Sequence, residues 1–151
     1  MAALDTLVNP PFANDPPIKV NFDAKVVGLV VAILAGIGAL FSLLALLGLL
    51  GVAAALSTFG GIYVLALIGV ALSLVGDVMA TIGGWQMYQA NESGKRLAIY
   101  GLAVSFVAEV IQIIGFSAGS GLVALILLAV LYYAIVVSRY PGQAPSASRG
   151  V

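Results

Sequence analysis

The first half of the chain is one long apolar stretch with a single charge. Residues 26–90 are 65 positions in which Asp77 is the only acidic or basic side chain. A helix needs about 20 apolar residues to cross a bilayer, so two spans fit here and a third would leave almost no room for turns. The strongest turn signal is the STFGG cluster at 57–61. We therefore predict spans at 26–50 and 62–88. The pattern leaves open whether 51–56 extends the first helix.

The second half repeats this organisation on a shorter scale. After the polar segment 91–96, apolar residues run over 97–116, and the turn signal SAGSG follows at 117–121. A last apolar run covers 122–137 and ends before Arg139 and the helix-breaking Pro141. The pattern predicts an all-α fold, an integral membrane four-helix bundle made of two helical hairpins. Residues 1–25 would form a Pro-rich N-terminal arm, 26–138 the transmembrane domain and 139–151 a tail.

The positions of the basic residues test this number of spans independently. Lys and Arg collect in cytoplasmic loops close to helix ends. Four spans would put all six basic residues on one side and leave the two opposite loops without charge. These residues are Lys19, Lys25, Lys95, Arg96, Arg139 and Arg149. We therefore expect a multi-pass protein of the cell membrane with both termini in the cytoplasm.

Composition excludes several classes of function. The chain is 62% hydrophobic and only 8% charged, which is typical of a membrane protein. It has neither Cys nor His, so disulfides, thiolate catalysis, His-based triads and the usual zinc sites are not expected. No basic cluster is present that could neutralise several phosphates, so nucleic acid is not an expected partner. We expect no enzyme activity, no cofactor and no metal.

Polar residues inside the predicted spans form the main candidate site. Asp77 and Glu109 are the only acids there, and each lies sixteen residues from Ser93. If the chain reverses at Ser93, the two carboxyls face each other at one depth. The same fold would pair Thr81 with Ser105 and Ser73 with Gln112, so that two polar stripes meet in register.

The candidate site supports more than one interpretation. An ionisable residue within a bilayer is costly and raises a functional hypothesis by default. No Lys or Arg lies in the spans, so two close carboxyls would share a proton. The cluster could be a hydrogen-bonded clasp between helices, a proton relay or a monovalent cation site. The residue types fit all three.

Small residues line one face of the first predicted span. They are Gly28, Ala32, Gly36 and Ala39, spaced close to four residues apart. Such a stripe lets another helix approach closely. A contact within the bundle and a homodimer interface both fit this pattern.

The segment before the first span has two proline pairs, Pro10-Pro11 and Pro16-Pro17, and few strong helix formers. It has no basic n-region, so we expect no cleaved signal peptide. An extended, polyproline-like arm is expected, either as a disordered tail or as a docking arm. The residues that would contact a partner are Phe12, Ile18, Val20 and Phe22.

Two functions therefore fit the sequence. The first is an accessory, assembly or structural subunit of a larger membrane complex, because the predicted extramembrane mass is small and the helices are rich in small residues. Its partners would be the lipid bilayer and other membrane subunits, or further copies of the chain. The alternative is a proton-coupled small transporter or an ion-conducting oligomer that uses Asp77 and Glu109.

Overall fold

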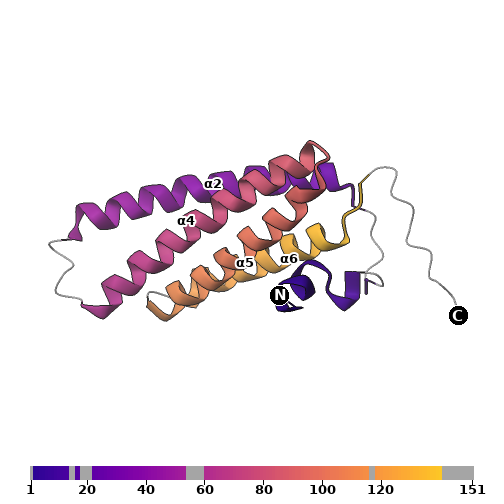
Figure 1. The fold of residues 1–151 in the computed structure, drawn as a ribbon. Coiled ribbons are helices and arrows are strands. Elements are labelled where there is room, and N and C mark those ends of the chain that lie inside the picture. The colour runs from indigo at the N-terminus through magenta and orange to yellow at the C-terminus, as the bar shows by residue number, and fades with distance from the viewer. Residues whose placement is uncertain (1, 14–15, 18–21, 54–59, 116–117, 141–151) are drawn as a thin grey trace, which may run out of the picture.

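The protein is an all-helical bundle, described by a computed structural model over residues 2–13, 16–17, 22–53, 60–115 and 118–140 (Figure 1). Two short elements come first, α1 (Ala2–Val8) and the 3-10 helix η1 (Pro11–Ala13). Four long helices follow: α2 (Ala24–Gly51), α4 (Gly61–Tyr88), α5 (Glu92–Gly115) and α6 (Ala118–Val137). The first three of these long helices are apolar and long enough to cross a membrane, and α6 has a shorter apolar stretch. The predicted fold class is confirmed.

The first hairpin has nearly the predicted bounds. Both α2 and α4 begin and end within two residues of the predicted spans. Gly51 is the last residue of α2, and the Val52 N–H donates to the Gly48 carbonyl at the helix end. Of the predicted turn at 57–61, only Gly60 and Gly61 are described, and Gly60 has a φ of 55°, which favours glycine. Residues 54–56 of the ambiguous segment lie outside the described residues.

The turn between α4 and α5 is tighter than predicted. α5 begins at Glu92, five residues before the expected start at 97. Ala90 has a φ of 62°, which reverses the chain within residues 89–91. The side-chain oxygen of Asn91 then accepts the Ser93 N–H at 3.1 Å, as an N-cap residue does. Most of the polar segment 91–96 is therefore the first turn of α5 and not a loop.

One end of the bundle holds the described basic residues, the N-terminal end of α2 and the C-terminal end of α6. The Ala24 N–H donates to the Arg139 carbonyl at 2.9 Å, and the Arg139 N–H donates to the Phe22 carbonyl at 3.0 Å. Lys95 Nζ donates to the Val136 carbonyl at 2.9 Å. The negative end of the α6 dipole also stabilises the Lys95 cation at this position. We call this end, which holds Lys25, Lys95, Arg96 and Arg139, the basic end. Lys19 and Arg149 lie outside the described residues.

The best-packed part of the bundle is the seam between α4 and α5. Six positions of α4 that are three and four residues apart are buried, and α5 has a matching series. The two series are Gly69, Ser73, Gly76, Ala80, Gly83, Met87 and Gly94, Ala98, Gly101, Ser105, Ala108, Gln112, of which only Gln112 is partly exposed. This spacing is the 3.5-residue period of supercoiled helices. Because most of these side chains are very small, the two backbones touch: a Cβ added to Gly83 would lie 2.7 Å from the Ala98 Cα.

The small residues of α2 serve a contact within the chain. A Cβ added to Gly84 of α4 would lie 2.6 Å from the Gly28 carbonyl and 2.7 Å from the Ala32 nitrogen. Gly36 lies next to Thr81, with its added Cβ 3.7 Å from the Thr81 methyl carbon. Ala39 is partly buried. Part of the predicted stripe therefore packs on α4.

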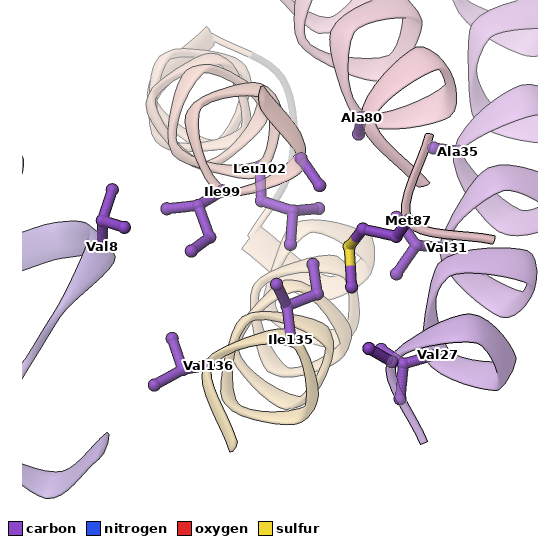
Figure 2. Close-up of a cluster of buried hydrophobic side chains, with 12 residues drawn as sticks. Val8, Val27, Val31, Ala35, Ala80, Met87, Ile99, Leu102, Ile135 and Val136 are labelled. Atoms are coloured by element: carbon purple, nitrogen blue, oxygen red, sulfur yellow. The ribbon is translucent and has the colours of Figure 1, made fainter. Parts of the chain in front are cut away.

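The hydrophobic core lies at the basic end. Figure 2 shows Met87 of α4 between Val31 of α2 and Ile135 of α6, with Ile99 of α5 beside them. These four side chains are at most 2% exposed. In contrast, α2 has no buried residue from position 36 to its end at Gly51. α2 is thus closely packed near the basic end and loosely packed towards the opposite end, whereas α4 still has buried residues there, such as Ala66 and Gly69.

The N-terminal arm folds back onto the bundle. Val8 of α1 is buried near Ile99 and Val136 (Figure 2), and the Tyr132 hydroxyl donates to the Leu7 carbonyl at 2.8 Å. The ring of Phe12 stacks on that of Tyr133 with centroids 6.0 Å apart.

The expectation of an extended arm is wrong for these two elements. Burial of apolar side chains on α5 and α6 stabilises them, and Pro11 begins a helical turn, where its missing N–H costs little. Of the residues predicted to dock a partner, Phe12 packs within the chain, Phe22 is exposed, and Ile18 and Val20 lie outside the described residues.

Candidate functional site

Asp77 is the centre of a hydrogen-bonded cluster contributed by three helices. The Ser42 hydroxyl of α2 donates to Asp77 Oδ2 at 3.0 Å, and the Ser105 hydroxyl of α5 donates to Oδ1 at 3.1 Å. Each carboxyl oxygen therefore accepts a hydrogen bond from a neutral donor. Since lipid offers no donors, these serines satisfy the Asp77 carboxyl within the protein.

Of the other predicted polar pairs, one is present and one is not. Gln112 Nε2 donates to Ser73 Oγ at 2.8 Å, as the two polar stripes predict. The Thr81 hydroxyl instead donates to the backbone carbonyl of Asp77, one turn back in its own helix, at 2.7 Å. Because the Ser105 hydroxyl donates to Asp77, the predicted pairing of Thr81 with Ser105 is wrong.

The register of the hairpin explains this difference. Along the seam, Gly76 lies against Ser105, Ala80 against Gly101 and Gly83 against Ala98, and each pair of residue numbers sums to 181. The predicted pairs sum to 185 or 186, because they assumed that the chain reverses at Ser93. It reverses within 89–91, since Asn91 already caps α5. Gln112 lies against Gly69, a pair that also sums to 181, and its long side chain still reaches Ser73 one turn along α4.

The two carboxyls are consequently staggered. Asp77 lies opposite Ser105, and Glu109 lies one helical turn, about 6 Å, further from the basic end. The expectation of equal depth is therefore wrong. Within the described part of the chain, the Glu109 carboxyl has no hydrogen-bond partner.

Both carboxyls line a cavity of about 350 Å³ between α2 and α6. Its inner wall, from α4 and α5, carries all of its polar groups except Ser42 of α2, and its sides come from α2 and α6. The polar lining residues are Ser42, Ser73, Asp77, Ser105, Glu109 and Gln112. At its rim, Leu34 and Phe41 of α2 and Leu127 of α6 are 40%, 68% and 48% exposed. The cavity is therefore a groove that opens sideways between α2 and α6, and we call it the α2–α6 groove.

Ser42 is a site residue that the sequence reasoning missed. A signal was available: Gly28, Ala35 and Ser42 are seven residues apart on one stripe of α2. That stripe faces α4 and the groove, so a hydroxyl at its next position meets Asp77. The small residues of the predicted stripe are about four residues apart, and that spacing follows a neighbouring stripe of α2 that does not include position 42.

The cluster has the chemistry of an uncompensated carboxyl pair. None of the six basic residues of the chain lies near the groove in sequence, and the four described ones are at the basic end. No group of three or more His, Cys, Asp or Glu that could hold a metal ion occurs among the described residues. Such a pair can share a proton, hold a monovalent cation or pair with a cationic side chain of another molecule.

Comparisons with known proteins add no family to this picture. A scan against protein-family models, a search of curated proteins and a search of solved structures each returned no match to the chain.

Proposed function

We propose that this protein is an accessory or assembly subunit of a larger complex in the membrane. The observation that carries this proposal is the α2–α6 groove, in which two acids lie within long apolar helices without a counterion among the described residues. A charge within a bilayer is costly unless a partner compensates it. A subunit that is completed by another chain accounts for an open, acidic groove better than a monomer in lipid does.

The uneven packing of the bundle supports the same proposal. The basic end has a dense core, yet α2 lacks buried residues over its last 16 positions. Within the described ranges, little of the chain lies outside the long helices, and α1 and η1 pack on the bundle. The surfaces available to a partner are therefore mainly those of membrane helices.

The orientation is part of this proposal. Lys25, Lys95, Arg96 and Arg139 lie at one end of the bundle, and cytoplasmic ends of membrane helices carry the excess of basic residues. The protein would thus lie in the cell membrane, and its basic end would face the cytoplasm. The groove would then open in the outer half of the bilayer.

Position-specific cross-linking in the native membrane tests the accessory role. A photoreactive residue replaces Phe41, at the rim of the groove, or Leu47, which lies on α2 but does not line the groove. Both side chains are well exposed, at 68% and 57%. We expect a discrete cross-link to a second membrane protein from position 41 and not from position 47. A protein that purifies gently as a monomer, without such a cross-link, would refute the accessory role.

A second candidate is a proton-coupled transporter or an ion-conducting oligomer. The observation that favours it is that a cavity, and not a dry helix contact, reaches both Asp77 and Glu109. Proton and monovalent cation fluxes are measured in vesicles for the wild type and for Asp77→Asn and Glu109→Gln. Flux that both variants abolish would favour transport; a wild type without flux would count against it.

A further inference from the structure

The α2–α6 groove has the shape of a helix-docking site. Ala35, Gly38 and Ala45 line it from α2, and Ala124 lines it from α6. Small residues such as these let the backbone of another helix approach closely. Along most of the groove α2 and α6 do not pack on each other; α2 packs on α4, and α6 packs on α5 (Figure 1).

The charge of the groove identifies what a docked helix must carry. Asp77 receives only two neutral hydroxyl donors, and Glu109 has no hydrogen bond within the described chain. Within the long helices, Lys and Arg occur only in the first turns at the basic end, as Lys25, Lys95 and Arg96. A second copy of this chain could therefore not neutralise the carboxyls from its own spans.

We propose that the groove receives a transmembrane helix of a different protein and that a Lys or Arg of this helix pairs with Glu109 and Asp77. This inference rests on the proposed accessory function and names its partner. Two staggered carboxyls suit a guanidinium or ammonium group, which can donate to both. Opposite charges that meet inside a membrane commonly pair in this way.

The depth of the carboxyls restricts where the partner's basic residue lies. Asp77 lies opposite Ser105, which is thirteen residues from the start of α5 at Glu92, and Glu109 is seventeen residues from that start. At 1.5 Å per residue these positions are about 20 and 26 Å from the basic end. In a hydrocarbon core about 30 Å thick, the basic residue belongs between the middle and the opposite face.

The rim of the groove favours a helix over a free cation. Leu34, Phe41 and Leu127 are apolar and exposed, so a hydrated ion would have to cross an apolar border to reach the acids. A transmembrane helix covers the same rim with its own apolar side chains while it brings the charge. Such a helix covers the apolar rim and neutralises the two acids at the same time.

Synthetic transmembrane peptides provide the test. The full-length protein is reconstituted in zwitterionic lipid vesicles with Leu/Ala host peptides that carry an energy acceptor, and the single native Trp85 is the donor. The peptides differ only at one central position, which is Arg, Gln or Leu. We expect the Arg peptide to bind about tenfold or more tightly than the Leu peptide, as close charge pairs allow. The Gln peptide should gain much less.

Variants of the protein show whether the groove is responsible. The double variant Asp77→Asn with Glu109→Gln should remove the advantage of the Arg peptide while the helical circular dichroism spectrum is unchanged. Ala124→Leu should weaken the binding of the Arg peptide because it fills the groove, whereas Ala129→Leu, at an exposed position of α6 that does not line the groove, should not. Equal binding of the Arg and Leu peptides, or an Arg advantage that survives the double variant, would overturn the proposal.

These outcomes are separate from those of the accessory role. If the native cross-link from position 41 forms but persists in the double variant, the accessory role stands and the charge pairing is refuted. If the Arg peptide binds as expected and no native partner is cross-linked, the charge preference of the groove stands and the accessory role is refuted.

Discussion

The seam between α4 and α5 gives a sharp prediction for the substitution Gly83→Ala. An added Cβ would lie 2.7 Å from the Ala98 Cα and 2.9 Å from the Gly94 carbonyl oxygen, whereas ordinary contacts begin at 3.4 Å. Both neighbours are backbone atoms of α5, so no side chain can rotate away. The helices must separate locally by at least 0.7 Å, the difference between 3.4 and 2.7 Å. Overpacking of this kind costs about 1–3 kcal/mol.

A matched control isolates this cost. Gly48 of α2 has no atom within 4 Å of an added Cβ, so Gly48→Ala makes the same chemical change without a clash. Both variants gain helix propensity of up to about 1 kcal/mol, and the clash remains as the difference between them. We expect Gly83→Ala to be less stable than Gly48→Ala by about 1–3 kcal/mol in the free energy of unfolding.

Reversible unfolding in mixed micelles, followed by circular dichroism, measures this difference. Energy transfer between labels on α4 and α5 would report whether the helices separate. Equal stability of the two variants would refute the close backbone packing inferred for the seam.

Three further substitutions can be examined by the same unfolding measurement. Asn91→Ala removes the cap of α5 and should cost about 1 kcal/mol, and an unchanged stability would contradict the capped turn. Lys95→Met removes the donor to the Val136 and Ser138 carbonyls at the end of α6 and should cost about 1 kcal/mol. Amide exchange at that helix end should become faster, and unchanged exchange would contradict this role. Asp77→Leu leaves the Ser42 and Ser105 hydroxyls without their acceptor and should cost about 1–3 kcal/mol. This cost should exceed that of Asp77→Asn and that of Glu109→Leu. Equal tolerance of Leu at both acids would contradict the hydrogen-bonded cluster.

The candidate site was predictable in its residues but not in its geometry. Asp77, Glu109 and the Ser73–Gln112 pair follow from the scarcity and spacing of polar residues in apolar helices. The stagger of the carboxyls depends on where the chain reverses, and a shift of about two residues in the turn changes which backbone positions of α4 and α5 lie opposite each other. The sequence does not show this shift, because the polar segment 91–96 fits either a loop or the capped first turn of a helix.

The amino-acid sequence by itself determined that the chain forms four apolar helices and that its acids lie deep within them, because hydrophobic length and the scarcity of charge are properties of single segments. It also indicated which residues are small enough for close helix contacts. Only the tertiary structure decided that Ser42 and Ser105 bind Asp77, that α1 packs on the bundle and that α2 and α6 leave a groove. These features depend on the rotation and register of helices that already satisfy their own backbone hydrogen bonds, and packing between helices fixes both.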